Sequence, residues 1–220
     1  KHIITVKTEH KAVLNTCEYL ETKGYEVTYL DVDSNGLISI SDLKNAISEN
    51  TALIAIMSVN NEIGIIQDIQ EIGRIARQSS VCFFCDATQA IGKVSVNVFR
   101  DKIDMLCLSA HKMNGPKGIG ALYVKRGVKI TPLIHGGGQE QGMRGGTYNT
   151  PLIVGLGEAC RLAHVDHNQR VKDLILEKEK WQRYFTEQNL GEVNFSAVPT
   201  APHILSISLK NMEADEFLML

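Results

Sequence analysis

Short apolar runs alternate with amphipathic segments along the first half of the chain. The segments between the runs place apolar residues at helical spacing, so that Ile69, Ile72 and Ile75 would share one face of a helix. The runs themselves have the length and the β-branched and aromatic content of strands. They lie at residues 2–6, 25–32, 52–59, 81–85 and 104–110. Because alternating strands and helices imply right-handed crossovers, we predict an α/β fold with a mostly parallel sheet flanked by helices.

The pattern changes at Pro151. From there to about Asn189 the chain has one long, increasingly charged helical pattern, and residues 203–210 then have the composition of a strand. We therefore expect residues 1–165 to form one large domain. Residues 166–220 would form a long helix and the beginning of a smaller, incomplete α/β domain.

Composition and charge narrow the classes of partner. The chain has 220 residues and a net charge of −2, and its basic residues are scattered. We therefore expect neither nucleic acid nor a membrane surface as a partner. The chain has neither an apolar run of membrane-spanning length nor the pattern of a secretory signal, so we expect a cytoplasmic protein. Its 5 cysteines lie mostly in apolar stretches, which is typical of reduced core residues.

Polar residues follow three successive apolar runs. Asn60, Asn61 and Glu62 follow the third run, the segment from Asp86 to Gln89 follows the fourth, and His111–Lys112 follows the fifth. Parallel sheets bind ligands beyond the carboxyl ends of their strands, so these clusters predict a site at one sheet edge. Each cluster alone is also compatible with a cap or a turn. In that alternative, His111 and Lys112 end a strand and Asp86 caps the next helix.

The residue types at these positions suit one kind of chemistry. Lys112, between a histidine and a glycine-rich loop, could form a Schiff base with a carbonyl, and pyridoxal phosphate supplies such a carbonyl. An aspartate such as Asp86 could hold the protonated ring nitrogen of that cofactor. We expect Thr8 to be a helix N-cap, which places His10 in the first turn, where the helix dipole favours an uncharged ring. An uncharged imidazole could stack on a pyridine ring.

Residues 31–42 match the pattern of a calcium-binding EF-hand loop. Asp31, Asp33 and Asn35 occupy ligand positions, Gly36 the turn position and Asp42 the last position. An EF-hand loop follows a helix, whereas residues 25–32 alternate like a strand. A strand-to-helix turn is therefore favoured, and a calcium-binding module is kept as the lesser alternative. We expect no metal site elsewhere.

Five motifs, in this order and with these gaps, resemble one family. They are "TEHKAV", "VNNEIG", "DATQ", "SAHKMNGPKGIGALYV" and "HGGGQEQGMRGGT". The chain resembles the cysteine desulfurases of the fold-type I pyridoxal-phosphate enzymes, or class V aminotransferases, and in particular the group that serves iron–sulfur cluster assembly. The resemblance runs from Lys1 to the end of the chain. It implies the large domain of that fold, with the upstream part missing, followed by the start of the small domain.

The resemblance also implies roles for individual residues. Lys112 would carry the cofactor as a Schiff base and assist proton transfer, and Asp86 would pair with the ring nitrogen. His10 would stack on the ring and shuttle protons. Asn61 and Gln89 would contact the phenolic oxygen and the bound substrate. The phosphate would be held by Ser109 and His111 and, across a dimer interface, by Thr147.

The family reaction converts L-cysteine to L-alanine and leaves the sulfur as an enzyme persulfide. The resemblance therefore implies L-cysteine as substrate, a homodimer, and an iron–sulfur scaffold or another sulfur acceptor as partner. It implies the cytoplasm as location, or the mitochondrial matrix in a eukaryote.

Several family features are not found in the sequence. The attacking cysteine and the arginine that binds the substrate carboxylate would lie downstream of Leu220, and a phosphate-binding turn would lie upstream of Lys1. Asn114, Gln139 and Gly145 replace residues that are usual in the iron–sulfur group. We therefore expect a fragment of a cysteine desulfurase. The alternative is a degenerate, catalytically inactive remnant or a regulatory subunit of that family.

Overall fold

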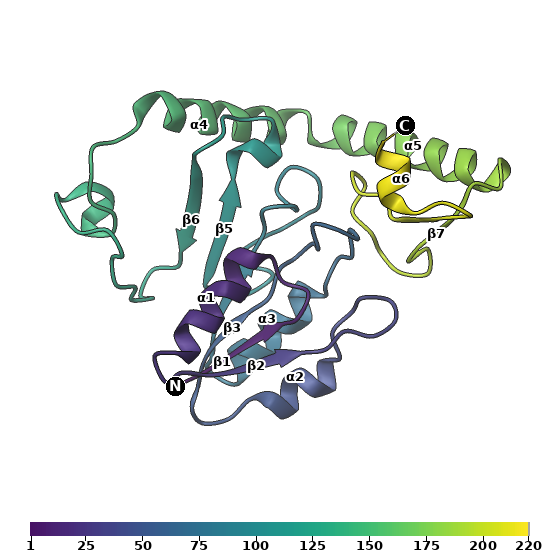
Figure 1. Ribbon diagram of the computed structural model, residues 1–220. Coiled ribbons are helices and arrows are strands. Elements are labelled where there is room, and N and C mark those ends of the chain that lie inside the picture. Colours follow the sequence, from purple (N-terminus) through teal and green to yellow (C-terminus); the bar gives the residue numbers. More distant parts are fainter. Residues whose placement is uncertain (220) are drawn as a thin grey trace.

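A six-stranded sheet forms the centre of the computed structural model, which describes residues 1–219 (Figure 1). The strand order is β2-β1-β3-β4-β5-β6. The first five strands pair in parallel, and the last runs antiparallel to its neighbour. The strands are β1 (His2–Val6), β2 (Glu26–Leu30), β3 (Thr51–Ala55), β4 (Cys82–Asp86), β5 (Met105–Ser109) and β6 (Gly120–Val124). This topology confirms the predicted α/β fold with a mostly parallel sheet.

Helices and loops cover both faces of the sheet. All five residues of β1 are buried, which requires cover on both faces because successive side chains point in opposite directions. The covering helices are α1 (Lys11–Glu21), α2 (Ile40–Ala46) and α3 (Ile69–Gln78). In α3, the predicted inward residues Ile69, Ile72 and Ile75 are all buried. They pack in one core cluster with Phe83 of β4, which is also fully buried.

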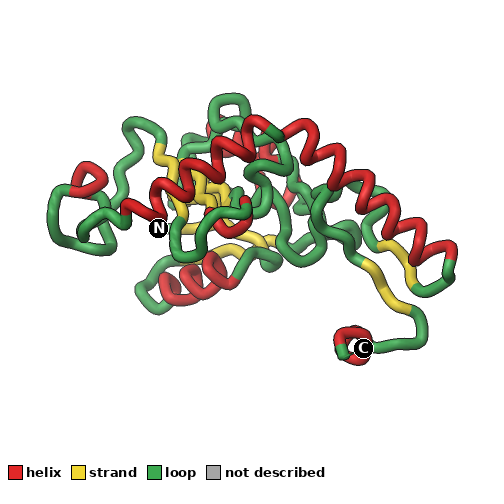
Figure 2. The backbone as a smooth tube through the Cα atoms, turned by 90° about the horizontal axis from the view of Figure 1, so that it is seen from above, coloured by secondary structure: helices red, strands yellow, loops and turns green. Residues whose placement is uncertain are grey.

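The segment predicted as one long helical stretch forms two helices. These are α4 (Thr150–Val165) and α5 (His167–Glu187), which follow one another as the long rod in Figure 2. Asp166 separates them because its backbone, at φ −96° and ψ 9°, leaves the helical range. Beyond α5, the chain forms the two-stranded sheet of β7 (Gly191–Val193) and β8 (Ile207–Leu209), followed by α6 (Ala214–Leu218). The strand predicted from residue 203 therefore begins only at residue 207.

Residues 31–42 form the strand–turn–helix that the sequence favoured. The segment is entered from β2 and leads into α2. The carboxylate of Asp33 accepts hydrogen bonds from the backbone amides of Asn35, at 2.9 Å, and Leu37, at 3.0 Å. The buried Gln67 side chain closes the turn, since it accepts from the Ile38 amide and donates to the Gly36 carbonyl. The Asp33 carboxylate thus stabilises the turn itself.

Within residues 1–219, no three His, Cys, Asp or Glu side chains gather closely enough to hold a metal ion. None of the helices in the described part of the chain combines the length and the apolar character needed to cross a bilayer.

Candidate active site

Four neighbouring parallel strands end at one edge of the sheet. They are β1, β3, β4 and β5, which are consecutive in the strand order. Because parallel strands have their carboxyl ends at the same edge, the residues that follow them come together there. His10 follows β1, Asn61 follows β3, Asp86 ends β4, and Lys112 follows β5. The sheet topology therefore places the predicted clusters on adjacent strands.

His10 is itself the N-cap of α1, which corrects the expectation that Thr8 caps this helix. Its Nδ1 accepts a hydrogen bond from the Ala12 amide at 3.1 Å, and the helix begins at Lys11. A ring nitrogen can accept only when it carries no proton, so this bond places the proton of the neutral ring on Nε2. The imidazole is exposed. A histidine thus replaces the usual Ser, Thr or Asp as the side-chain cap.

Asn60 holds the loop that carries His10. Its Nδ2 donates to the Thr8 carbonyl at 2.8 Å, and its Oδ1 accepts from the amides of Glu62 and Ile63, each at 2.9 Å. Asn60 is buried, whereas Asn61 is half-buried. The first asparagine of the pair therefore stabilises the backbone of this loop.

Asp86 is fixed by the turn that follows β4. One carboxylate oxygen, Oδ1, accepts from the Thr88 amide at 2.9 Å. The described residues between β4 and β5 form turns and no helix, so the alternative in which Asp86 caps the next helix is wrong. The Asp86 carbonyl accepts from the Ser58 amide at 2.9 Å, which ties β4 to the segment after β3. Gln89, three residues further along, is buried with an exposed fraction of 8%. The turn thus presents a half-buried carboxylate and a buried amide.

Lys112 lies on a short 3-10 turn, Ala110–Met113, rather than on an extended loop. The turn ends at Asn114, which adopts the left-handed conformation at φ 61°. At its start, the Ser109 hydroxyl and His111 Nδ1 form a hydrogen bond of 2.8 Å. Gly115, which follows Asn114, packs so closely against the turn that an added Cβ would lie 3.0 Å from the Ala110 carbonyl oxygen. These contacts fix the backbone of the half-buried Lys112.

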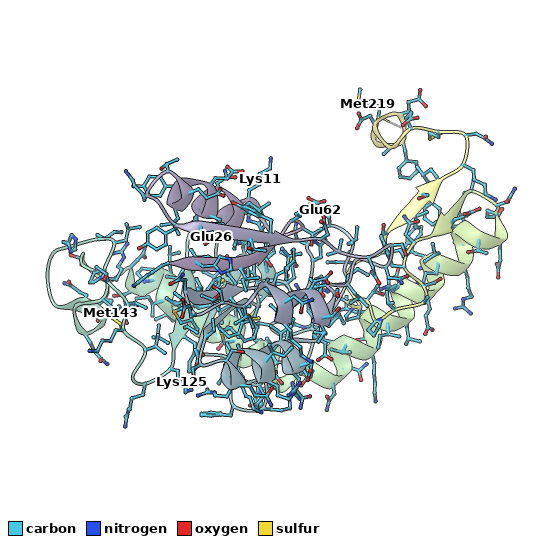
Figure 3. All side chains as sticks on the ribbon, turned by 90° about the horizontal axis from the view of Figure 1, so that it is seen from below. Lys11, Glu26, Glu62, Lys125, Met143 and Met219 are labelled. Atoms are coloured by element: carbon cyan, nitrogen blue, oxygen red, sulfur yellow. The ribbon has the colours of Figure 1, made fainter. Side chains whose placement is uncertain are left out.

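Thr147 lies outside this cluster. It is exposed and belongs to the excursion between β6 and α4. In Figure 3, Met143 marks this excursion at the end of the molecule away from Glu62, which directly follows Asn61. Within one chain, the sheet topology therefore places seven of the eight predicted site positions at the same sheet edge. Thr147 is the eighth and is not at this edge.

Glu9, beside His10, was not predicted as part of the site. Its exposed fraction is only 5%, its Oε1 accepts from the Met57 amide, and its Oε2 has no partner among the described residues. Burial raises the pKa of Glu9 from 4.5 to about 8, and the nearby Asp86 carboxylate adds to this increase. Its place directly after a buried strand was the signal that could have identified it. With a pKa of about 8, the Glu9 side chain near Asp86 is mostly a neutral carboxylic acid at pH 7.

His203 is a second residue that sequence reasoning missed. Its Nε2 lies 3.2 Å from Oε1 of Gln89, although the two residues are 114 positions apart. Burial lowers the pKa of His203 to about 4, and Lys93, Lys178 and Lys112 lower it further. No local pattern could have connected His203 with Gln89.

Burial makes four of the five cysteine thiols poor nucleophiles. All five cysteines are free thiols. Burial raises the pKa of Cys85 well above its usual range and that of Cys107 to about 12, and it also raises the pKa of Cys17 and Cys82. A thiol attacks as its thiolate, so these four side chains are poor candidates for a sulfur-accepting group. Cys82 and Cys85 show alternating burial along β4, as expected for residues on opposite faces of a strand.

Comparison with known proteins gives the family. The sequence model of the aminotransferase class-V family matches residues 1–220. The chain belongs to this family, and its relatives within it are cysteine desulfurases. It is 46% identical over 221 residues to the cysteine desulfurase IscS of Vibrio vulnificus strain YJ016, covering 100% of this chain and 55% of that protein. It is also 58% identical over 165 residues to the mitochondrial cysteine desulfurase of Arthroderma benhamiae, covering 74% and 33% of the two chains.

Solved structures give the same family fold. One NifS-like protein superposes with a TM-score of 0.90 at 37% identity over 96% of this chain and 58% of its own. A structure described as SspA in complex with cysteine superposes with a TM-score of 0.84 at 41% identity over 99% and 60%. The chain thus spans about half the length of the curated relatives it matches. The predicted family resemblance is confirmed.

Proposed function

We propose that this chain is the cofactor-binding part of a cysteine desulfurase that uses pyridoxal phosphate. The observation that carries the proposal is the placement of Lys112, Asp86 and His10 beyond the carboxyl ends of neighbouring parallel strands. The family supports it, since the relatives are named cysteine desulfurases and one structural neighbour is described with cysteine bound. The proposed reaction takes L-cysteine to L-alanine and transfers the sulfur to an acceptor.

The side chains at this edge fit pyridoxal phosphate chemically. Lys112 offers the amine that would anchor the aldehyde, and the Asp86 carboxylate would pair with the ring nitrogen. Ser109 and His111, which already contact each other, would hold the phosphate together with Thr147 of a second subunit. Asn61 and Gln89 would contact the cofactor oxygen and the substrate. When bound, pyridoxal phosphate withdraws electrons from the substrate, which lowers the barrier to breaking bonds at the α-carbon and in the side chain attached to it.

The protein groups would orient the cofactor and move protons. The Asp86 carboxylate is held by the Thr88 amide, so its negative charge is fixed where a cationic ring nitrogen would be stabilised. His10 carries its proton on Nε2, because Nδ1 is used by the Ala12 amide, and Nε2 is therefore the atom that can exchange a proton with a ligand. The Lys112 amine would act as a base near the substrate.

We propose the same division of the chain that the sequence predicted. Residues 1–165 would form most of the cofactor-binding large domain, and residues 166–220 the start of the small domain. The helix break at Asp166 supports this boundary. We also propose a homodimer, an iron–sulfur scaffold or another sulfur-acceptor protein as partner, and a location in the cytoplasm or the mitochondrial matrix. The bacterial and mitochondrial relatives support these locations.

A second candidate function is that of an inactive remnant or regulatory subunit. The observation that favours it is the high pKa of the buried thiols, which leaves Cys17, Cys82, Cys85 and Cys107 unsuited to accept sulfur. In this alternative the chain keeps the fold and does not bind pyridoxal phosphate at Lys112. Cofactor attachment therefore separates the two candidates.

The test is attachment of pyridoxal phosphate to the purified chain. After incubation and borohydride reduction, peptide mapping should find the adduct at Lys112, and the unreduced protein should be yellow. Lys112→Ala should abolish both. Lys117→Ala is the matched control, because Lys117 lies in the same glycine-rich segment and is exposed, and it should retain the colour and the adduct. Colourless protein, or adducts spread evenly over exposed lysines, would overturn the proposed function in favour of the remnant.

A further inference from the structure

The segment from Pro199 to His203 returns from the C-terminal part of the chain to the edge of the large sheet. The Ala201 amide donates to the Gly64 carbonyl at 2.7 Å, and the Ile66 amide donates to the Pro199 carbonyl at 3.2 Å. Ala201 is completely buried. The backbone of this segment is thus anchored to the loop that follows Asn61, independently of the His203 side chain.

Lys178 of α5 adds a second anchor to the same segment. Its Nζ donates to the Ala201 carbonyl at 2.9 Å and to the Thr200 hydroxyl at 2.6 Å. Close packing holds the next turn, because an added Cβ on Gly64 would lie 2.9 Å from Cβ of Ile204. His203 therefore approaches the large sheet from a fixed backbone.

The atoms in contact determine which of His203 and Gln89 donates the hydrogen bond and which accepts it. Oε1 of Gln89 is a carbonyl oxygen and can only accept, so Nε2 of His203 must donate. Burial lowers the pKa of His203 to about 4, and the positive charges of Lys93, Lys178 and Lys112 contribute to this decrease. The imidazole is therefore neutral at physiological pH, with its proton on Nε2. Its Nδ1 is a buried acceptor without a partner among the described residues.

This contact decides what Gln89 can offer to a ligand. An amide side chain has one acceptor group and one donor group, and its two orientations are nearly equal in shape. With Oε1 engaged by His203, the NH2 group of the buried Gln89 is the part left to face the site. The site would then select a ligand that places a hydrogen-bond acceptor, such as an anionic oxygen, beside this amide.

We propose that His203 is a positioning residue that locks the Gln89 amide with its NH2 group directed at the ligand. The proposal rests on the proposed function for the identity of the ligand, pyridoxal phosphate, but the contact itself concerns only this chain. It also assigns a role in the site to the C-terminal segment, which would complete the hydrogen bonding of a residue on the large sheet.

The first test uses the chain without cofactor. Long-range ¹⁵N–¹H spectra of His203 should show the neutral tautomer protonated at Nε2 throughout the neutral pH range. The Gln89 side-chain amide signals should shift in His203→Phe, which keeps a ring and removes the donor. They should not shift in His164→Phe, the matched control at an exposed histidine. Protonation at Nδ1, or unshifted Gln89 signals in His203→Phe, would overturn the proposal.

The second test adds pyridoxal phosphate and follows the visible band against pH. In His203→Phe, the pH at the midpoint of the change in this band should be higher than in wild type by about 0.5 to 1 pH unit. This is the effect of losing one oriented hydrogen bond to an anionic oxygen. The adduct at Lys112 should still form. His203→Gln should restore the wild-type midpoint, because its amide nitrogen can donate from nearly the same position as imidazole Nε2.

The outcomes separate this inference from the proposed function. Equal midpoints in wild type and His203→Phe, with the adduct formed in both, overturn the positioning role and leave the proposed function intact. A wild-type chain that takes up no pyridoxal phosphate overturns the proposed function and the ligand-facing half of this inference together. In that case the spectra without cofactor still decide whether His203 holds Gln89.

Discussion

At the scale of single residues, the candidate site depends on groups whose ionisation is set by burial. Glu9 is buried and His203 is half-buried, and in both residues desolvation is the main cause that favours the neutral form, since a charge without a partner is costly in the protein interior. The result is a carboxylic acid below the site and an uncharged imidazole beside it. Asp86 is held by the turn after β4, and in the proposed function it would pair with the ring nitrogen of the cofactor.

The buried Glu9 gives a stability prediction. Its pKa in the folded chain, about 8, is above the value of 4.5 that it has when unfolded. Between these two values the folded state holds a proton that the unfolded state has lost, so the free energy of unfolding decreases as pH rises. The slope for one group is at most about 1.4 kcal/mol per pH unit. Urea unfolding measured over this pH range should show the decrease.

Glu9→Gln should remove much of that decrease, because the amide keeps an acceptor for the Met57 amide and cannot ionise. Above pH 8 the variant should therefore be more stable relative to wild type than it is at pH 5. Glu62→Gln, at an exposed carboxyl, is the control and should leave the pH dependence unchanged. A wild-type pH dependence that persists in Glu9→Gln would show that another group causes it.

At the scale of elements, close packing between α3 and the loop before β5 fixes one layer over the sheet. Gly73 lies in the middle of α3 and faces the Asp101 carbonyl, where an added Cβ would lie only 1.9 Å from the oxygen. Glycine weakens a helix by about 1 kcal/mol relative to alanine, so its place here reflects the close approach of two backbones. Asp101 is itself buried and holds the loop through the Asn97 amide at 2.8 Å.

Gly73→Ala should therefore destabilise the chain. The methyl group must displace a backbone carbonyl, and we expect a loss of at least about 2 kcal/mol in the free energy of unfolding. Gly157→Ala in α4 is the matched control, because an added Cβ there meets no atom within 4 Å. That variant should gain up to about 1 kcal/mol from helix propensity. Denaturant titration of both variants measures the difference, and a neutral Gly73→Ala would mean that α3 moves away from the loop at little cost.

At the scale of the whole molecule, the C-terminal helices leave apolar surface uncovered. None of the residues described in α5 is buried, although the helix includes Ile175, Leu176 and Trp181. Val154 and Val165 of α4 are each 64% exposed, and Leu176 is 62% exposed. The rod of α4 and α5 runs along the outside of the molecule in Figure 2. Extended apolar surface of this kind favours association with another copy of the chain.

We therefore expect the chain to sediment as a dimer or a larger species at working concentrations. Val165→Glu combined with Leu176→Glu should shift the distribution towards the monomer, because each adds a charge to an apolar position. Asn168→Glu adds the same charge at an exposed polar position between them and should have little effect. Sedimentation velocity of the three proteins decides the matter, and a clean wild-type monomer would contradict the prediction.

The sequence alone determined the order of strands and helices and the residues at the strand ends. Local periodicity and the handedness of crossovers were enough to predict that Asn61, Asp86 and Lys112 would meet at one sheet edge. Only the tertiary structure decided which atoms these residues use, that His10 is a cap, that burial raises the pKa of Glu9, and that His203 contacts Gln89. The physical reason is that hydrogen-bond partners and desolvation depend on segments far apart in the chain, whereas periodicity reports only on neighbours.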